Sequence, residues 1–428
     1  MMLWQQAKFE SDPHFPVALA IALTLSASGM ALAAPDEDKL GKASGYPVGK
    51  AGNWFYEESV RVGSFTHQAE IPGIYRGKAN VLQPAQVPMP LATAAREPDY
   101  RWSVGDARDL TVGDFLARQR IMGLLIVKDG IVQVERYQYE RTRTDRFLSQ
   151  SMAKSITALA VGFALQEEKI RSLDDRADEY APRLRGTLLG ETTIRNLLRM
   201  ASGARYEERY TRTDDEVRFG TAVARDGVEA AARVLTDRET QQGTRFHYAG
   251  PHTAMLAAVV HGATGMSLSE YLTPRLWQPI GAEQSALWRA DSKGLEVALG
   301  NFNATLRDYA RLGIVLANDG VRPDDASGKQ IIPRAFLLEA TDWKLAPEPF
   351  RPGKATSYMG YGYQFWLYPG PTRRFMMLGV YGQSIFVDPG QKLVIVQTAA
   401  NATPQAGDST LGREREAFWR GVLRYYAK

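Results

Sequence analysis

The pattern of apolar positions is clearest between residues 121 and 169. The segments 123–127 and 131–137 are rich in aliphatic and β-branched residues and flank Asp129-Gly130, which is the composition of a hairpin with a tight turn. Shortly afterwards, the run 151–169 repeats apolar residues at helical spacing, contains no proline and gathers charge at its far end. The sequence therefore predicts a β-hairpin followed by a helix that begins at Ser151.

The rest of the chain divides into a helical middle and a late block of strands. Helices are predicted for three apolar segments that end at glycine or Asp-Gly signals: 192–200, 251–261 closed by Gly262, and 304–318. Four β-rich segments and a final helix follow: 361–367, 375–378, 383–387, 393–398 and 414–426. We therefore expect an α/β (α+β) fold, in which one antiparallel sheet from both chain ends is flanked by helices and a helical region is inserted at about 170–300.

The N-terminal end of the chain has a different pattern. Residues 17–34 form an apolar segment that ends in Ala31-Leu32-Ala33, just before Ala34-Pro35. This composition is typical of a signal peptide, here residues 1–34, cleaved near Ala33 or Ala34. We therefore expect a periplasmic or secreted protein. An uncleaved N-terminal membrane anchor is the alternative, because a segment of 18 apolar residues can just span a bilayer.

Residues 35–105 contain many Pro and Gly residues and show little periodicity. We interpret them as an N-terminal extension packed on a catalytic domain, residues 106–428, and expect short strands at 56–65. Partial disorder of this extension is the alternative, although its aromatic residues argue against it.

Composition excludes several classes of function. The chain has 428 residues, of which 44% are hydrophobic, so it can bury a sizeable core. Its net charge is +4, but the basic residues are spread out and form no run with interleaved aromatics, so a nucleic-acid partner is not expected. There is no cysteine, no H-x-x-x-H or H-x-H pair and no G-x-S-x-G elbow. We therefore expect neither a disulfide, a metal site nor an α/β-hydrolase triad.

The strongest chemical signal is Ser151-Met152-Ala153-Lys154 at the start of a predicted helix. Residues three apart on a helix lie on the same side, with Cβ atoms roughly 5–6 Å apart. A serine hydroxyl is a weak nucleophile until a base takes its proton, and a buried lysine can be that base because desolvation lowers its pKa. The helix start also favours negative charge nearby. S-x-x-K is the nucleophile motif of class A β-lactamases and penicillin-binding proteins.

Two later segments offer partners for this pair. Tyr248-Ala249-Gly250 lies on a predicted loop before a helix, where a tyrosine hydroxyl can point into a cleft. Since the pKa of tyrosine is about 10, it needs a cation such as Lys154 nearby to act as a base. The turn 379–383 carries Gly379 and Val380 between two predicted strands, where a backbone N–H can face a reacting oxygen. A buried structural tyrosine and an ordinary hairpin turn are the alternatives.

Taken in order, these elements resemble the penicillin-recognising serine hydrolases over residues 110–428. That family includes class C β-lactamases, D-alanyl-D-alanine carboxypeptidases, related esterases and 6-aminohexanoate-dimer hydrolase. Besides the Ser-x-x-Lys motif, the resemblance rests on four segments: 194–203, Tyr248-Ala249-Gly250, 306–313 and the Gly-Gln turn before Val387-Asp388-Pro389. It implies a β-lactamase/transpeptidase-like fold.

Two differences from class C β-lactamases indicate which branch of that family the chain is most similar to. Class C β-lactamases have Asn two residues after the tyrosine, where Gly250 stands here. They also have Lys-Thr-Gly on the late strand, where the order of elements places Met377-Leu378-Gly379. The lysine that grips a substrate carboxylate is therefore missing. The chain is more similar to the esterase and 6-aminohexanoate-dimer hydrolase branch, which has an acidic, tyrosine-rich stretch where this chain has residues 206–210.

The resemblance also implies a role for each residue. Ser151 would attack a carbonyl carbon, while Lys154 and Tyr248 move the proton. The backbone N–H groups of Ser151 and Val380 would hold the oxyanion, and Gln383 is the alternative to Val380. The residues expected on the substrate side are Tyr210, Gly250 and Gln383.

The sequence thus predicts a serine hydrolase that cleaves a small-molecule ester or amide through an acyl-enzyme. We expect it to use no cofactor or metal, and to contact a membrane only through the export signal. A β-lactamase or D-alanyl-D-alanine carboxypeptidase is the enzymatic alternative. A penicillin-binding-like sensor or binding protein, which keeps the fold without turnover, is the non-enzymatic one. His247 beside Tyr248 is interpreted as a structural or rim residue.

Overall fold

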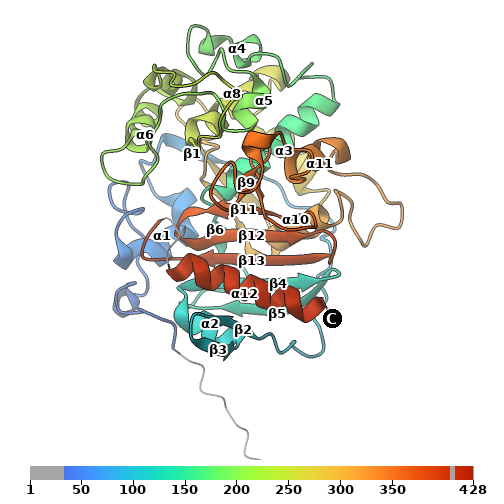
Figure 1. Cartoon of the computed structure of the whole chain (residues 1–428). Helices are drawn as coiled ribbons and strands as arrows, with labels where there is room; N and C mark the ends of the chain where they lie inside the picture. The colour runs from blue at the N-terminus through green and yellow to red at the C-terminus, as the bar shows by residue number, and fades with distance from the viewer. Residues whose placement is uncertain (1–32, 405–409, 428) are drawn as a thin grey trace, which may run out of the picture. The chain divides into compact units, whose positions relative to one another are not determined.

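A seven-stranded antiparallel sheet organises the protein, whose computed structural model describes residues 33–404 and 410–427 (Figure 1). Its strands are arranged in the order β5-β4-β13-β12-β11-β10-β9. Their bounds are β4 Ile121–Lys128, β5 Ile131–Tyr137, β9 Gly360–Tyr361, β10 Trp366–Leu367, β11 Phe375–Gly379, β12 Gln383–Asp388 and β13 Leu393–Ala399. The pairing of β13 with β4 joins the two ends of the chain, so the predicted sheet is confirmed.

Helices cover both faces of this sheet. On one face, α2 (Val112–Arg118) and α12 (Thr410–Tyr426) pack on Leu124 and Ile126 of β4; Figure 1 shows α12 lying along the sheet. On the other face, Leu125 and Val127 join the core that includes α3 (Met152–Gln166), α8 (Gly250–Thr264) and α10 (Leu306–Ala317). Successive side chains of a strand point to opposite faces. Because both faces are covered, seven of the eight residues of β4 are buried.

A second sheet places the start of α3. It has four antiparallel strands in the order β1-β7-β8-β6, with bounds β1 Arg76–Leu82, β6 Arg146–Leu148, β7 Ala286–Asp291 and β8 Phe302–Thr305. β6 ends just before Ser149, whose N–H donates to the carbonyl oxygen of Phe302 at 2.7 Å. The sequence did not predict this sheet, because its strands are short and come from three distant parts of the chain.

From Ala34 onward, the described residues belong to one compact unit, so the extension is part of the folded body. Besides β1, it contains α1 (Arg61–His67). The strands expected at 56–65 are wrong: Val62, Phe65 and Ala69 are buried at helical spacing, and this pattern outweighs the shorter alternation at 60–62. The predicted signal peptide lies almost entirely outside the described residues.

Other boundaries differ from the prediction for local reasons. α8 continues past Gly262 and ends at Gly265, whose φ of 71° suits a left-handed helix cap. Gly262 instead allows close approach, since a Cβ there would lie 2.0 Å from the carbonyl oxygen of Tyr180. The strand expected at 361–367 is two short strands around a turn in which Gln364 has a φ of 61°.

Most of the remaining helices and strands are short. α5 (Ile194–Leu198) is capped by Thr193, whose side chain accepts from the N–H of Asn196, in agreement with the predicted capping threonine. The others are α4 Ala177–Tyr180, α6 Asp215–Asp226, α7 Val228–Ala231, α9 Leu268–Leu272, α11 Arg334–Thr341, β2 Trp102–Val104 and β3 Ala107–Leu110. Within the described ranges, no helix has the length and apolar character needed to cross a membrane.

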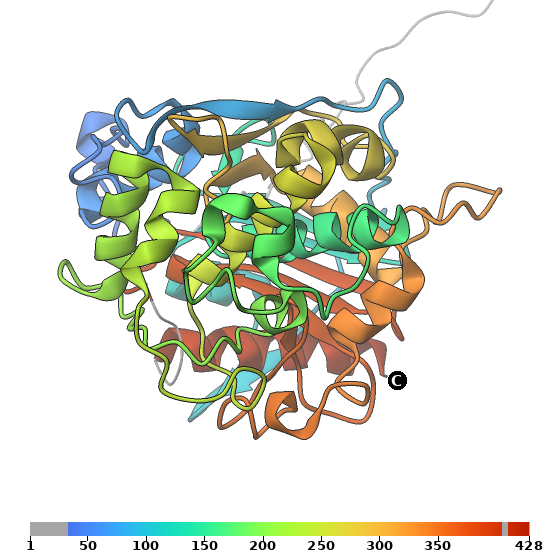
Figure 2. The ribbon, with the colours of Figure 1, turned by 90° about the horizontal axis from the view of Figure 1, so that it is seen from above.

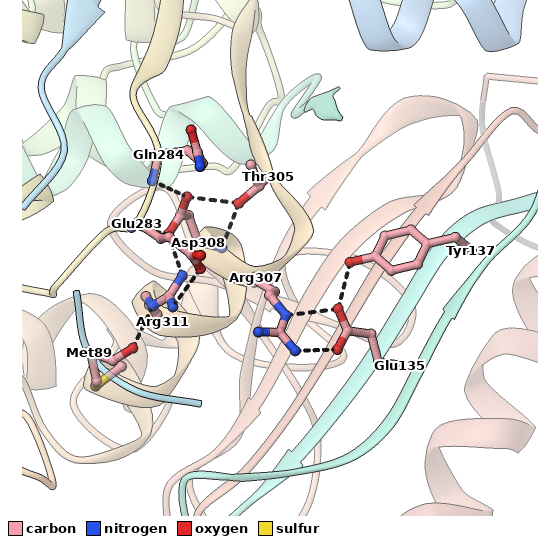
Figure 3. A network of polar contacts seen from close by, with 9 residues as sticks. All are labelled: Met89, Glu135, Tyr137, Glu283, Gln284, Thr305, Arg307, Asp308 and Arg311. Carbon is pink, nitrogen blue, oxygen red and sulfur yellow. Dashed lines mark hydrogen bonds and ion pairs between the residues drawn. The ribbon is translucent and has the colours of Figure 1, made fainter. Parts of the chain in front are cut away.

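The segment 306–313, one of the motifs behind the resemblance, has a structural role around Asp308 (Figure 3). The buried carboxylate accepts from the backbone N–H groups of Glu283 and Gln284 at 2.7 and 3.1 Å. It also accepts from the Thr305 hydroxyl at 2.7 Å and from the Arg311 guanidinium at 2.8 Å. The carboxylate therefore fixes the segment that leads into β7, while α10 is capped by Thr305, whose hydroxyl oxygen accepts from the N–H of Asp308 at 3.1 Å.

The arginines of the same motif extend the network (Figure 3). Arg311 donates to the carbonyl oxygen of Met89 in the extension at 2.9 Å. Arg307 makes two bonds, at 2.9 and 2.7 Å, to the carboxylate of Glu135 on β5. α10 thus ties the extension, the inserted region and the large sheet together.

Candidate active site

Ser151 stands at the N-cap of α3, directly after a turn that the second sheet holds in place. The preceding residue, Gln150, has a φ of 47°, in the left-handed region that non-glycine residues seldom adopt. Ser151 lines a cavity of about 350 Å³. The serine predicted as nucleophile therefore faces accessible space at a helix start, where unpaired N–H groups favour negative charge.

Lys154 lies one turn further along α3 with its amine buried; only 1% of the residue is exposed. Its Nζ donates to Ser151 Oγ at 2.9 Å and to the carbonyl oxygen of Leu299 at 2.5 Å. Burial lowers the pKa of Lys154, while the charges of Glu208 and Glu216 act against this. A neutral amine at this distance can accept the proton of the Ser151 hydroxyl.

Tyr248 completes the predicted trio from the loop before α8. The Nζ of Lys154 lies 5.2 Å from the centre of the phenol ring, and the Ser151 hydroxyl is close enough to lower the pKa of the phenol. The ring stacks on Trp366 at 5.7 Å and contacts the edge of Tyr361 at 6.1 Å, so strands β9 and β10 hold it in place.

The electrostatic environment of Tyr248 differs from the one that the sequence suggested. Burial raises the pKa of Tyr248 well above its ordinary value; Glu208 and Tyr361 add to the rise, and the hydrogen bond with Ser151 opposes it. The phenol therefore stays protonated, and Lys154 is the better placed base.

The turn between β11 and β12 lies against the residues that lead into Ser151. A Cβ on Gly379 would be 2.5 Å from the carbonyl oxygen of Ser149, so only glycine allows this approach. Val380 lines the cavity together with Ser151. The N–H of Tyr381 donates to the carbonyl oxygen of Pro404 at 2.8 Å and is engaged there. Of the two N–H groups, that of Val380 is the better candidate to face a reacting oxygen.

Gln383 is not placed as a substrate contact, which corrects that expectation. It is fully buried and does not line the cavity. Its Nε2 donates to the carbonyl oxygens of Ala399 and Val380 at 2.7 and 3.2 Å, and its Oε1 accepts from the N–H of Ala399 at 2.9 Å. Since its polar atoms bind backbone, Gln383 fixes the 379–383 turn against β13.

The other two predicted substrate-side residues meet at Glu208. Tyr210 lines the cavity and its hydroxyl donates to Glu208 Oε1. The N–H of Gly250 donates to Glu208 Oε2 at 2.7 Å. A Cβ on Gly250 would lie 3.3 Å from Glu216 Oε2, so this glycine lies beside both carboxylates, but it does not itself line the cavity.

The sequence did not single out Glu208 and Glu216, which both line the cavity. Burial, followed by the charge of Glu208, raises the pKa of Glu216 to about 8. Tyr206 donates to Glu216 Oε2 at 2.7 Å. The acidic composition of 206–210 was the available signal for Glu208, whereas nothing near Glu216 distinguishes it from a surface residue of α6.

The histidines near Tyr248 brace its loop. His247 Nε2 lies 2.6 Å from the carbonyl oxygen of Tyr206. His252 is buried between the Ser202 hydroxyl at 2.6 Å and the carbonyl oxygen of Ala249 at 2.9 Å, and burial lowers its pKa to about 4. These contacts fit the structural role expected for His247 and extend it to His252.

Comparison with known families gives this geometry a context. Residues 109–417 match the family model described as Beta-lactamase. The chain belongs to the beta-lactamase family. Within this family, it is 28% identical over 287 residues to 6-aminohexanoate-dimer hydrolase of Paenarthrobacter ureafaciens, a match that covers 65% of this chain and 72% of the relative.

Solved structures share the beta-lactamase fold of this chain. A Bacillus anthracis protein named provisionally as a 6-aminohexanoate-dimer hydrolase superposes with a TM-score of 0.74 at 24% identity, covering 87% of this chain and 95% of its own. A family VIII carboxylesterase superposes with a TM-score of 0.53 at 19% identity, covering 70% and 92%. The predicted fold and the resemblance to this family are thus confirmed.

Proposed function

We propose that the protein is a serine hydrolase that cleaves a linear amide or a carboxylic ester through an acyl-enzyme on Ser151. One observation carries this proposal: Lys154 Nζ lies 2.9 Å from Ser151 Oγ beside a cavity. At the same distance, the Ser151 hydroxyl can donate to a neutral amine of Lys154, and its proton can then pass to that amine. Membership of the beta-lactamase family supports the proposal.

The first half of the reaction forms the acyl-enzyme. Ser151 Oγ attacks the carbonyl carbon, and its proton passes to the neutral amine of Lys154. The carbonyl oxygen becomes an oxyanion, which accepts hydrogen bonds from the N–H groups of Ser151 and Val380. The protonated phenol of Tyr248 donates to the leaving nitrogen or oxygen and is reprotonated from Lys154. The bond between the carbonyl carbon and the leaving group then breaks.

The second half reverses the proton path. Water attacks the acyl carbon, its proton passes to Lys154, and the returning proton restores the Ser151 hydroxyl as the acid leaves. The same side chains therefore serve both halves, and neither half needs a group beyond this chain and water.

The cavity favours linear substrates with an amino group over β-lactams. Glu208 lines it, and its carboxylate attracts a cationic amine such as the one in the substrate named for the Paenarthrobacter relative. Glu216, whose pKa is raised to about 8, adds a second negative charge only above neutral pH. Met377 is fully buried at the place where class C β-lactamases have the lysine that binds a substrate carboxylate. Its side chain is uncharged, so it cannot bind a carboxylate as that lysine does. We therefore propose ω-amino amides and short acyl esters as the substrate class.

A substrate panel with an active-site probe tests this function. The full chain should react with a fluorophosphonate at Ser151, and Ser151→Ala should not react. Hydrolysis of p-nitrophenyl acetate and of the linear dimer of 6-aminohexanoate should be faster than that of nitrocefin or a D-alanyl-D-alanine peptide. Labelling of Ser151→Ala, faster nitrocefin turnover, or labelling without turnover of any substrate would each contradict the proposal.

We also propose that residues 1–34 direct export to the periplasm or the medium, which the apolar run before Ala34 supports. N-terminal sequencing of the protein recovered from these fractions should begin near Ala34. Recovery of the uncleaved chain in the membrane fraction would instead support the anchor.

A further inference from the structure

The N-terminal extension forms one side of the cavity that holds Ser151. Its contribution is mainly aromatic and aliphatic, from residues far from the nucleophile in sequence: Ala51, Trp54, Phe55, Tyr56, Ile74 and Tyr75. In Figures 1 and 2, the blue extension and the yellow-green helix α6, which also lines the cavity, lie side by side. The cavity is therefore incomplete without a segment that contains none of the Ser-x-x-Lys chemistry.

We propose that this segment, residues 51–75, is a specificity wall that receives the hydrocarbon chain of the acyl group and selects substrates by its length. The inference deepens the proposed function and rests on it. Aromatic side chains bury large apolar areas with little loss of conformational freedom. Each methylene buried against such a wall is worth about a fourfold gain in binding.

The wall is held rigidly, as a selective surface must be. The guanidinium of Arg289 on β7 donates to the carbonyl oxygens of Ala69, Ile71 and Ile74 at 3.0, 3.0 and 2.6 Å. Directly afterwards, β1 pairs with β7 along the edge of the second sheet. These contacts fix the path of the chain on both sides of Ile74, so the wall belongs to the fold of the catalytic body.

Phe55 connects the wall to the reaction site. Its ring contacts the edge of Tyr381 at 5.2 Å and lies 6.1 Å from the ring of Tyr210. Tyr381 follows Val380, whose N–H is placed to hold the carbonyl oxygen in the proposed mechanism. An acyl group anchored there has its chain start next to Phe55, which is why we assign the acyl side of the substrate to this wall.

Tyr381 is itself held by the extension. The guanidinium of Arg61 lies 4.3 Å from the ring centre of Tyr381, and Phe65 lies 5.4 Å away on the same helix, α1. Arg61 also donates to the carbonyl oxygen of Asn401 at 2.8 Å. The wall and the 379–383 turn are therefore positioned by one set of contacts, which keeps the distance between acyl carbon and wall constant.

Chain-length profiles of wall variants test the proposal. For the full-length protein, kcat/KM is measured on p-nitrophenyl acetate and p-nitrophenyl hexanoate, and the hexanoate-to-acetate ratio is the readout. We expect hexanoate to be preferred and Phe55→Ala to lower the ratio at least tenfold, because the chain loses its apolar partner. Ala51→Trp, which fills the cavity from an exposed position, should lower the ratio without depending on the stability of the core.

Tyr46→Ala is the matched control. Tyr46 is a buried aromatic of the same extension that packs on Tyr139 and does not line the cavity. Its loss should leave the ratio within about twofold of wild type. An unchanged ratio in Phe55→Ala and Ala51→Trp, or an equal fall in Tyr46→Ala, would overturn the wall. A wild-type protein that cleaves neither ester would instead remove the proposed function as well.

Discussion

Replacing Lys154 with methionine separates proton transfer from packing. Methionine is close to lysine in length and fills the buried site, but it cannot accept a proton. Lys154→Ala is a poorer test, because it would leave a cavity next to the nucleophile. The site loses the amine contacts with Ser151 Oγ and the Leu299 carbonyl oxygen, at 2.9 and 2.5 Å.

The two expected effects differ in size. General-base catalysis contributes about 10²–10⁴ in rate, so kcat/KM should fall by that factor. This corresponds to about 3–5 kcal/mol of transition-state stabilisation at 1.36 kcal/mol per decade. The folded state loses one partner of the partly buried Leu299 carbonyl, which costs at most about 1–3 kcal/mol. It also no longer has to desolvate an amine, so the free energy of unfolding should change by no more than about 2 kcal/mol.

The assay compares the rate of fluorophosphonate labelling, kcat/KM on p-nitrophenyl acetate and the urea unfolding midpoint. Lys169→Met is the matched control, because Lys169 is exposed just beyond the end of α3. It should retain wild-type rates. A Lys154→Met protein that keeps more than a tenth of the acylation rate, or that loses activity only in proportion to unfolding, would refute Lys154 as the base.

Three further predictions follow from individual contacts. Gly379→Ala places a Cβ 2.5 Å from the Ser149 carbonyl oxygen and should lower kcat by about 10²–10³, because it displaces the N–H of Val380. Gly52→Ala is the control, since a Cβ at Gly52 would meet open space, and it should leave kcat unchanged. Equal kcat values for the two variants in steady-state assays would contradict this prediction. Glu216→Gln tests how the protonation of Glu216 is linked to stability. The pKa of Glu216 is raised from 4.5 to about 8 in the folded state, so the stability that wild type has below pH 4.5 is lost as the pH rises to 8. The difference in Tm in favour of the variant should therefore grow between pH 4.5 and 8 and then level off. An advantage that shrinks with rising pH in thermal scans would show the opposite shift. Asp308→Ala leaves Arg311 and two backbone N–H groups without their buried partner, so the free energy of unfolding, measured with denaturant, should fall by about 3–5 kcal/mol. The folded fraction should keep the wild-type kcat. A fall of less than about 1 kcal/mol would contradict the structural role of this network.

The prediction from sequence was strongest where the signal was local. Ser151 and Lys154 share one side of one helix, so their spacing alone brings them together. The hairpin β4–β5 and the helices α3 and α10 were likewise identified from periodicity and turn residues within a few positions of their observed bounds. Tyr248 and Val380 were suggested by their places on a predicted loop and turn, and the order of elements that the family shares gave them their roles.

Other parts of the site had no local signal. Gln383 was expected at the substrate because of its place in a turn, but the carbonyl of Ala399 from another strand occupies its amide. Glu216 has the sequence context of an ordinary residue at the start of an amphipathic helix, and its pKa is raised by burial and by the charge of Glu208. Phe55 gave no periodic signal at all.

The sequence by itself determined the pairing of Ser151 with Lys154 and the antiparallel sheet, since each depends on spacing within one segment or on apolar runs that must be buried. Only the tertiary structure decided which groups surround that pair: the neutral state of Tyr248, the two carboxylates and the aromatic side of the cavity. These depend on burial and on contacts between segments far apart in the chain, and neither the solvent exposure of a group nor its distant neighbours can be read from local spacing.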